Sequence, residues 1–188
     1  MTGIVLYGPP ASGKSATTVA LAHVDPRFTL VRKLKVGNRR GTEYDFTSPE
    51  ELARLRAAGR LLVESRRYGN TYAIDRHQID RLTAAGQVPI VHLGNISDIR
   101  RLIQPAPWLV ILLWVPRRVC EQRSQQRGDR DTILRLKAWD ETLADLAAND
   151  DDLFHHRFHT DQATPEEVAQ EIASAFLHQH EPGLRHLA

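Results

Sequence analysis

Residues 8–15, near the N-terminus, read Gly-Pro-Pro-Ala-Ser-Gly-Lys-Ser and match the pattern G-x-x-x-x-G-K-[ST] without a gap. Gly8 and Gly13 allow the backbone to turn tightly and to point several N–H groups at one anion. A helix that starts near Lys14 would add the positive end of its dipole. The pattern predicts that Lys14 reaches the β- and γ-phosphates of ATP and that Ser15 holds Mg²⁺. The expected ATP-binding residues are Gly8, Pro9, Pro10, Ala11, Ser12, Gly13, Lys14, Ser15 and Ala16.

The segments on either side of this loop have the patterns that a phosphate-binding loop requires. Residues 2–7 form a short apolar run typical of a buried strand, and residues 16–23 continue with a helical pattern. Strand, loop and helix therefore follow in the order that the motif needs. The alternative interpretation is a tight strand-to-helix turn that binds no ligand.

The charge balance and the single cysteine restrict the partners and the compartment. The chain has 188 residues with 25 Lys and Arg and 23 Asp and Glu, so its net charge of +2 does not favour nucleic acid or an anionic membrane as a partner. Cys120 is the one cysteine, which excludes an internal disulfide framework and fits a packing role in a reducing cytoplasm. The longest apolar run, residues 108–115, is too short to span a membrane, and the first residues lack a signal-peptide pattern. We expect a cytoplasmic protein, and the sequence leaves a homodimer open.

Strand-like and helix-like segments alternate along the chain, which predicts an α/β fold with a mostly parallel core sheet. We expect a P-loop three-layer α/β/α domain over residues 1–178, followed by a flexible tail at residues 179–188. The expected strands are residues 3–7, 28–33, 61–65, 88–93, 109–115 and 157–159. Capping patterns predict helix starts at Ser48, Asp75 and Thr164. Further helices are expected at residues 96–103, 116–126 and 131–148.

The middle of the chain, residues 32–74, differs from the rest because it is rich in Arg, Tyr and Gly and contains short strands and turns. An insertion between the first core strands and the later ones is a natural place for a second substrate to bind. We therefore expect this segment to form a small acceptor-binding insertion.

Several motifs follow the phosphate-binding loop in a fixed order. They are Glu43-Tyr44-Asp45-Phe46 with Thr47-Ser48-Pro49-Glu50-Glu51-Leu52, then Leu62-Val63-Glu64, then Tyr68-Gly69-Asn70-Thr71-Tyr72, and finally Arg123 with Arg127-Gly128. Over most of residues 3–177 this order resembles the guanylate kinase family of P-loop nucleoside monophosphate kinases. The resemblance implies transfer of the γ-phosphoryl group of ATP to a phosphate monoester.

The resemblance also implies an acceptor-phosphate site in the insertion. Arg32, Lys35 and Tyr44 would hold this phosphate, since a dianion needs cations and a phenol can add a hydrogen bond. The alternative for Arg32 and Lys35 is a solvated basic stretch over residues 32–40. Further expected acceptor contacts are Glu64, Tyr72 and His92.

An Arg-rich lid over about residues 117–135 is implied in the same way. Arg127, Arg130 and Arg135 match the lid positions best and are expected to neutralise phosphate charge during the reaction. For the remaining arginines of this segment, Arg117, Arg118 and Arg123, we favour an ordinary charged helix surface. Asp161, which follows the last strand, is expected to contact adenine.

The expected base pocket departs from the guanylate kinase pattern. Glu64 is retained, but the family's Tyr-Gly-Ser step has become Tyr72-Ala73-Ile74, and His92 and Gly94 stand where aspartates usually occur. Guanine presents N–H donors that need carboxylate or hydroxyl acceptors, so this loss reduces its recognition. His92 is either an acceptor contact or a buried, hydrogen-bonded histidine. We therefore expect a non-guanine or modified nucleoside monophosphate as the acceptor.

Neither of the core strands expected at residues 88–93 and 109–115 ends in Asp or Glu. Mg²⁺ would then be held by Ser15, by ATP oxygens and by water.

Three other functions stay open: a sugar-phosphate kinase similar to the ribose 1,5-bisphosphate phosphokinases, a guanylate kinase proper, and a non-catalytic guanylate-kinase-like binding module.

Overall fold

The core of the molecule is a parallel sheet in a computed structural model that describes residues 2–67, 69–129, 131–149 and 151–180. Its five strands lie in the order β2-β7-β1-β8-β9, and each neighbouring pair is parallel. The bounds are β1 (Ile4–Tyr7), β2 (Phe28–Leu30), β7 (Val88–Leu93), β8 (Leu109–Trp114) and β9 (His156–His159). The predicted α/β fold with a mostly parallel core sheet is confirmed.

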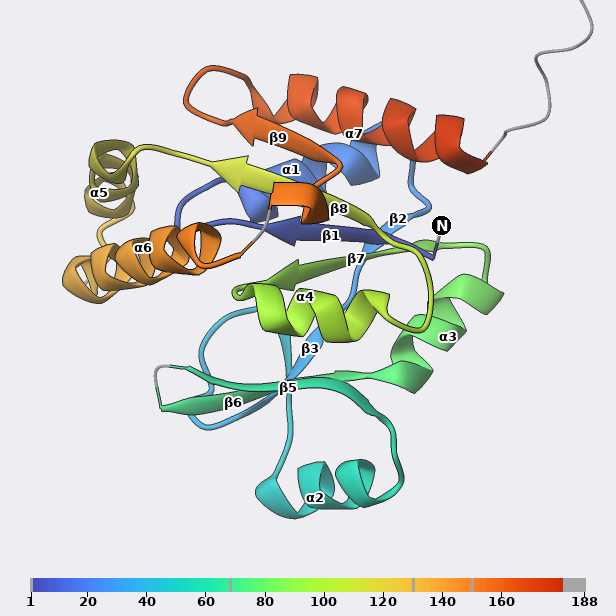
Figure 1. Cartoon of the computed structure of the whole chain (residues 1–188). Helices are drawn as coiled ribbons and strands as arrows, with labels where there is room; N and C mark the ends of the chain where they lie inside the picture. The colour runs from blue at the N-terminus through green and yellow to red at the C-terminus, as the bar shows by residue number, and fades with distance from the viewer. Residues whose placement is uncertain (1, 68, 130, 150, 181–188) are drawn as a thin grey trace, which may run out of the picture.

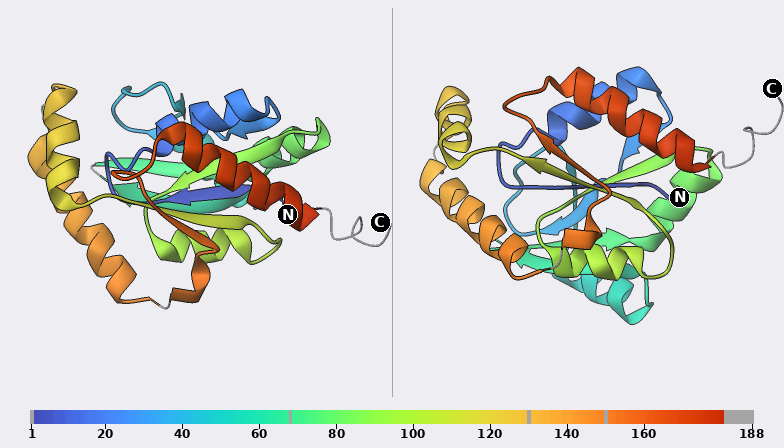
Figure 2. Two further views of the ribbon diagram at one scale, coloured as in Figure 1. Left: turned by 90° about the horizontal axis from the view of Figure 1, so that it is seen from above. Right: turned by 45° about the horizontal axis from the view of Figure 1, so that its top comes forward.

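Apolar side chains alternate along β1 and are buried on both faces of the sheet, as expected for a central parallel strand. Ile4 and Leu6 pack against α1 (Lys14–Val24) and α7 (Pro165–His180), which lie side by side in Figures 1 and 2. Val5 and Tyr7 face the opposite side, where α3 (Arg76–Ala84) and α4 (Ile96–Ile103) contribute buried isoleucines. The three layers therefore form around a strand that ends directly at the phosphate-binding loop.

A second sheet lies beyond α4, at the bottom of Figure 1. Its four strands have the order β4-β3-β6-β5, with bounds β3 (Lys33–Val36), β4 (Tyr44–Phe46), β5 (Leu61–Arg67) and β6 (Asn70–Asp75). β4 pairs with β3 in parallel, whereas β6 is antiparallel to β3 and to β5. The helix α2 (Pro49–Ala57) lies on the side away from the core sheet. This separate sheet is the structural form of the insertion expected at residues 32–74.

Two helices stand beyond the ends of β1 and β8 in Figure 1, and both belong to the segment expected to form a lid. They are α5 (Arg117–Gln126) and α6 (Thr132–Ala147). Cys120 and Trp139 bury against Ala11 and Val115, so this helix pair packs on the phosphate-binding loop itself. Cys120 is fully buried, as its expected packing role requires. A short 3-10 turn (Asp151–Leu153) leads from α6 to β9.

The helix starts were predicted well because each rests on a local hydrogen bond. Ser48 accepts from Glu51 N (3.1 Å), and Thr164 and Glu167 cap each other reciprocally. Asp75 caps α3 through His77 N (3.1 Å) and not through a box with Gln78.

The strand expected at residues 28–33 is wrong in one respect, because it is broken after Leu30. Val31 still donates to Ile90 O (2.8 Å) beside β2, and the chain then leaves the core sheet to start β3 in the second sheet. The expected flexible tail begins inside α7, which extends to His180, and residues 181–188 lie outside the described part of the chain.

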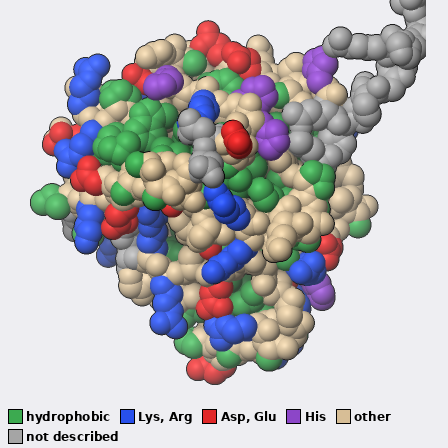
Figure 3. All heavy atoms as spheres, viewed as in Figure 1, with side chains coloured by type: hydrophobic (Ala, Val, Ile, Leu, Met, Phe, Trp, Pro, Cys, Tyr) green, Lys and Arg blue, Asp and Glu red, His purple; other side chains and the backbone are tan. Residues whose placement is uncertain are grey.

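On the face shown in Figure 3, basic and acidic side chains are interspersed. In the described part of the chain, none of the helices combines the length and the hydropathy needed to traverse a lipid bilayer.

Candidate active site

The phosphate-binding loop connects β1 to α1 with the geometry that its glycines permit. Gly8 (φ +152°) approaches β8 so closely that a Cβ there would lie 2.0 Å from Leu113 O. Gly13 (φ +88°) adopts the left-handed conformation directly before the first helical residue, Lys14. The free N–H groups at the start of α1 and its dipole therefore face the concave side of the loop, as an anion site requires.

Lys14 folds back over this loop. Its Nζ donates to Gly8 O (2.8 Å), Pro9 O (2.8 Å) and Ser12 Oγ (3.3 Å). Burial, followed by repulsion from Lys33, lowers the pKa of Lys14 to about 7. An anion placed in the loop would therefore favour the protonated amine.

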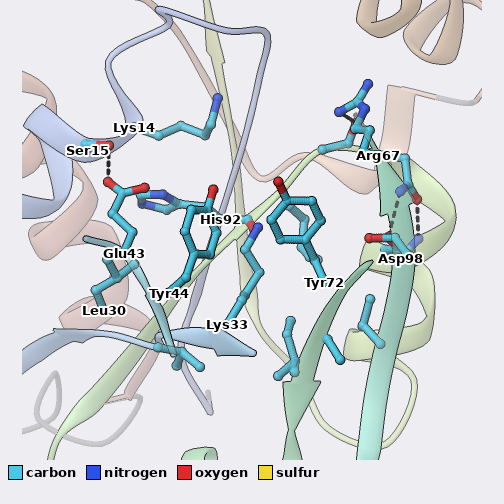
Figure 4. Close-up of a pocket in the computed structure, with 18 of the residues that line it drawn as sticks. Lys14, Ser15, Leu30, Lys33, Glu43, Tyr44, Arg67, Tyr72, His92 and Asp98 are labelled. Carbon is cyan, nitrogen blue, oxygen red and sulfur yellow. Dashed lines mark hydrogen bonds between the residues drawn. The ribbon is translucent and has the colours of Figure 1, made fainter. Parts of the chain in front are cut away.

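A cavity of about 240 Å³ opens between this loop, the end of β7 and the second sheet. Figure 4 shows the polar side chains of three segments meeting there: the loop, the second sheet and the start of α4. The residues that line this cavity include Lys14, Ser15, Lys33, Glu43, Tyr44, Val63, Ser65, Arg67, Tyr72, Ala73, Ile74, His92, Leu93, Gly94 and Asp98.

Two cations of the second sheet line the cavity opposite Lys14. Lys33 Nζ donates to His92 O (3.0 Å), and burial lowers the pKa of Lys33 to about 8 while the Glu43 carboxylate opposes this shift. Arg67 donates to Gly94 O (3.1 Å) and to Glu141 Oε2 of α6 (3.3 Å). The site thus collects positive charge from the phosphate-binding loop and from the second sheet.

Tyr44 and Tyr72 stand on either side of Lys33. Their ring centroids lie 5.3 Å apart, and Lys33 Nζ lies 5.9 Å from the Tyr44 centroid and 5.5 Å from the Tyr72 centroid. In Figure 4 both hydroxyls and the Lys33 amine extend in the same direction from the sheet. The arrangement offers two phenolic hydrogen-bond groups beside one amine, which suits a phosphate.

His92 at the end of β7 is buried and hydrogen-bonded. Its Nε2 lies 2.8 Å from Thr18 Oγ1, and its side chain lines the cavity beneath Lys14 and Lys33. Burial, with the charges of Lys14 and Lys33, lowers the pKa of His92 well below its ordinary value. His92 is therefore a neutral, buried and hydrogen-bonded side chain that also borders the cavity, and its contact with an acceptor stays a prediction.

Ser15 and Glu43 form the oxygen-rich corner of the cavity. The Ser15 hydroxyl donates to a Glu43 carboxylate oxygen, so a residue of α1 contacts the loop that precedes β4. Within the described residues, no group of three or more His, Cys, Asp or Glu side chains could hold a metal ion. Hard oxygen donors beside a phosphate site nevertheless fit Mg²⁺, which commonly takes only one or two protein oxygens when phosphates supply others.

A second cavity, of about 360 Å³, lies beside Gly13 and the first turn of α1. Arg123 of α5 borders it and donates to Ala11 O (2.9 Å) and to Thr160 O (2.6 Å). Thr160 Oγ1 in turn donates to Ser12 O (3.0 Å). Arg123 therefore ties α5 and the end of β9 to the phosphate-binding loop.

Known guanylate kinases resemble this chain in sequence. The guanylate kinase of Symbiobacterium thermophilum is 33% identical over 132 residues, which are 66% of this chain and 62% of that protein. The guanylate kinase of Bordetella pertussis is 30% identical over 129 residues, which are 66% of this chain and 60% of that protein. The chain thus matches less than two thirds of the length of these relatives. No protein-family model matches the chain.

Solved structures resemble the fold over nearly the whole chain. The guanylate kinase of Anaplasma phagocytophilum has a TM-score of 0.64 at 17% identity and covers 97% of this chain, with 87% of that chain covered. The shikimate kinase of Acinetobacter baumannii, solved with shikimate, has a TM-score of 0.52 at 15% identity and covers 96% of this chain, with 95% of that chain covered. The chain has a guanylate-kinase-like P-loop fold.

Three of the expected acceptor contacts do not line the cavity. Arg32 is exposed and pairs with Asp45 (2.7 Å), because the chain turns outward between the two sheets. Lys35 is buried two residues after Lys33 on β3, where its Nζ donates to Asn38 Oδ1 and Arg40 O (both 2.8 Å). Glu64 pairs with Arg56 of α2 (2.6 Å) on the far side of the second sheet. Tyr44, Tyr72 and His92 line the cavity, and their contact with an acceptor stays a prediction.

The expected cations of the lid and the expected adenine contact are also not gathered around one cavity. Arg127 lines the second cavity, whereas Arg135 pairs with Asp129 (3.0 Å) and Asp131 (3.2 Å) and lines neither cavity. Asp161 is exposed, and its neighbour Thr160 lines the second cavity instead. Arg130 lies outside the described residues.

The residues that sequence reasoning missed are Lys33, Glu43 and Arg67, together with Arg123, which was assigned to an ordinary surface. Glu43 lies in the Glu-Tyr-Asp-Phe motif, but the motif alone predicts no role for it. Alternation along β5 could have pointed to Arg67, because Val63, Ser65 and Arg67 share the face that lines the cavity. The alternation along β5 can be read from the sequence, but only the pairing of β5 with β6 determines which face of the strand points to the cavity.

Proposed function

We propose that this chain is an ATP-dependent phosphotransferase that acts on a phosphate monoester, most specifically a nucleoside monophosphate other than GMP. The single observation that carries the proposal is that the phosphate-binding loop and a cluster of cations and phenols face each other across one cavity. A donor and an acceptor that are both anionic need this arrangement, because their mutual repulsion opposes close approach.

The donor side rests on the loop from Gly8 to Ser15. Its backbone turn, the N-terminus of α1 and Lys14 offer the usual elements of a triphosphate site. The second cavity beside Gly13 and Arg123 has room for the base of the donor nucleotide. Ser15, with Glu43 beside it, would hold Mg²⁺, which supplies charge neutralisation between the β- and γ-phosphates.

The acceptor side rests on the second sheet. Lys33, Arg67, Tyr44 and Tyr72 converge on one region of the cavity and offer the charge and hydrogen bonds that a dianionic phosphate requires. They take the place of the cations first expected at Arg32 and Lys35.

The wall of the cavity supports an acceptor other than GMP. Val63, Ala73, Ile74 and Leu93 make this wall largely apolar, and the carboxylate of Glu64 is engaged with Arg56 outside it. Among the described residues that line the cavity, the carboxylates are Glu43 beside Ser15 and Asp98, which accepts from Asn95 Nδ2 (2.6 Å). Guanine N–H donors would meet few acceptors on the apolar wall, and unpaired buried donors reduce affinity.

The chemistry needs no covalent intermediate on the protein. An oxygen of the acceptor phosphate attacks the γ-phosphorus of ATP, the bond from this phosphorus to the β–γ bridging oxygen breaks, and ADP leaves. Lys14 holds the transferred group from one side, and Lys33 and Arg67 orient the attacking phosphate from the other. Movement of the α5–α6 segment as a lid, with Arg127 and Arg130 approaching the phosphates, stays a prediction.

A sugar bisphosphate is the second candidate acceptor. The cavity of about 240 Å³ is small and carries Lys14, Lys33 and Arg67, which favours a compact ligand with more than one phosphate. Ribose 1,5-bisphosphate is such a ligand.

The cytoplasmic location of the protein stays a prediction from the sequence, and the sequence leaves open whether it forms a homodimer.

A substrate screen tests the proposal. The purified chain is incubated with ATP, Mg²⁺ and single acceptors, namely the common nucleoside monophosphates and ribose 1,5-bisphosphate, and ADP is measured. We expect one acceptor other than GMP to stimulate ADP formation and Lys14→Ala to lower that rate by about 10²-fold or more. A chain that forms no ADP with any acceptor would refute phosphotransfer, and a clear preference for GMP would refute the base assignment alone.

A further inference from the structure

Glu43 occupies a position that joins the two substrate sites. It belongs to the segment between β3 and β4, directly before Tyr44, and its carboxylate accepts from the hydroxyl of Ser15 on α1. Glu43 is partly buried in the cavity between Lys14 and Lys33, and its charge counteracts the lowering of both lysine pKa values. A side chain of the second sheet thus reaches the phosphate-binding loop.

The core strands around that loop end without an acidic residue. The residues that follow β1, β7 and β8 are Gly8, Gly94 and Val115. Asp98 also lines the cavity, but its carboxylate accepts from Asn95 Nδ2 (2.6 Å) and lies 3.7 Å from Arg101 Nη1. Of the carboxylates that the described residues place in the cavity, Glu43 is therefore the one in contact with Ser15.

We propose that Glu43 completes the Mg²⁺ site from the acceptor side of the cavity. The inference rests on the proposed function, because it concerns the cation that accompanies ATP. By accepting the Ser15 hydrogen, Glu43 leaves the lone pairs of the Ser15 oxygen available to the metal ion. Its second carboxylate oxygen offers an acceptor for a metal-bound water, as outer-sphere carboxylates commonly do.

This arrangement links the metal to the acceptor through adjacent residues. Glu43 contacts Ser15, and Tyr44 lines the acceptor region beside Lys33. An acceptor that orders Tyr44 would also fix the backbone that carries Glu43. Metal and acceptor therefore bind cooperatively, each raising the affinity for the other by the same factor.

Metal binding measured without turnover tests the proposal. Mn²⁺ replaces Mg²⁺ and is titrated into chain held in excess over a non-hydrolysable ATP analogue, while free Mn²⁺ is followed by electron paramagnetic resonance. Glu43→Gln preserves the shape of the side chain and should raise the Mn²⁺ dissociation constant by about tenfold. Asp45→Asn, which removes an acid that lies two residues away and pairs with Arg32, is the matched control and should leave the constant unchanged.

The outcomes separate this proposal from the proposed function. If Glu43→Gln binds Mn²⁺ as tightly as the unaltered chain while the analogue still binds, Glu43 serves only as a counter-charge for the lysines and the proposal is overturned. If the unaltered chain fails to bind the analogue at all, both the proposed function and the role of Glu43 are refuted. Thermal unfolding of both variants verifies that each is folded.

Discussion

At the scale of single residues, the site is organised by an excess of positive charge. Lys14, Lys33 and Arg67 share one cavity, and burial lowers the pKa of Lys14 to about 7 and that of Lys33 to about 8. Bringing cations together in a buried space is unfavourable unless anions join them. The cavity therefore favours the entry of phosphate groups.

Proton uptake at Lys14 follows from this balance. With a pKa of about 7 in the free chain, Lys14 is mostly neutral at high pH, while a bound triphosphate favours its charged form and raises the pKa in the complex. Affinity for ATP is thus greatest below pH 7 and falls as the pH rises from there toward the pKa of the complex. Calorimetry at about pH 8.5 in two buffers of different ionisation enthalpy should show the uptake.

Lys14→Ala provides the control for that experiment, because it removes this titrating amine and should reduce the buffer dependence of any residual binding to what Lys33, with a pKa of about 8, contributes. Identical binding enthalpies for the unaltered chain in both buffers would argue against a titrating Lys14.

Lys33, rather than Arg32, is expected to bind the acceptor phosphate. Lys33→Met keeps the length of the side chain and removes its charge, so the acceptor KM should rise about tenfold to hundredfold, as expected for losing a charged hydrogen bond. Arg32→Met changes the adjacent residue, which pairs with Asp45 outside the cavity, and should leave this KM unchanged. Steady-state kinetics at saturating ATP decide between them, and the reverse order of effects would contradict the assignment.

The same residues show why sequence predicted some contacts and missed others. Gly8 to Ser15 are contiguous, so their geometry follows from a local turn and could be predicted. Lys33, Glu43 and Arg67 line one cavity only because the four strands of the second sheet pair in a particular register, and the carboxylate of Glu64 is withdrawn by Arg56 of a neighbouring helix. Tertiary partners of this kind leave no local signal.

At the scale of elements, the second sheet is fastened to the core beside the site. Arg67 of β5 donates to Gly94 O at the end of β7 and to Glu141 of α6. On the donor side, Arg123 of α5 donates to the phosphate-binding loop and to Thr160. Two arginines therefore set the positions of the elements that surround the phosphates, in addition to any direct role.

Gly94 tests whether the position of Arg67 matters. A Cβ at Gly94 would lie 2.4 Å from Arg67 Nη1, and the φ of Gly94 is outside the left-handed range. Gly94→Ala should therefore displace the guanidinium with little loss of stability, raising the acceptor KM by about tenfold through a lost charged contact.

The double variant separates this explanation from a general disturbance. In an Arg67→Met background, Gly94→Ala should add nothing further to KM, since residues that act through one contact are non-additive. Additive effects of the two changes would show that Gly94→Ala acts elsewhere.

At the scale of the whole molecule, the layers place the phosphate-binding loop opposite the cations of the second sheet. The core sheet carries the phosphate-binding loop at the end of β1, and the second sheet, which lies below α4 in Figure 1, lines the other side of the cavity. The alternation of strands and helices predicted the core correctly, because its central strands β1 and β8 are continuous apolar runs and β7 is largely apolar. The second sheet was expected only as an insertion, since β3 and β4 have four and three residues and are defined by their pairing with other strands.

The central claim is that a phosphoryl group passes from ATP to a phosphate monoester within this cavity. Phosphorus NMR of the chain with ATP, Mg²⁺ and the best acceptor of the screen measures this directly. We predict that the γ-phosphorus signal of ATP declines while signals of ADP and of a new phosphoanhydride on the acceptor grow together, and that Lys14→Ala suppresses both. Growth of inorganic phosphate alone, or no change beyond that seen with Lys14→Ala, would contradict the claim.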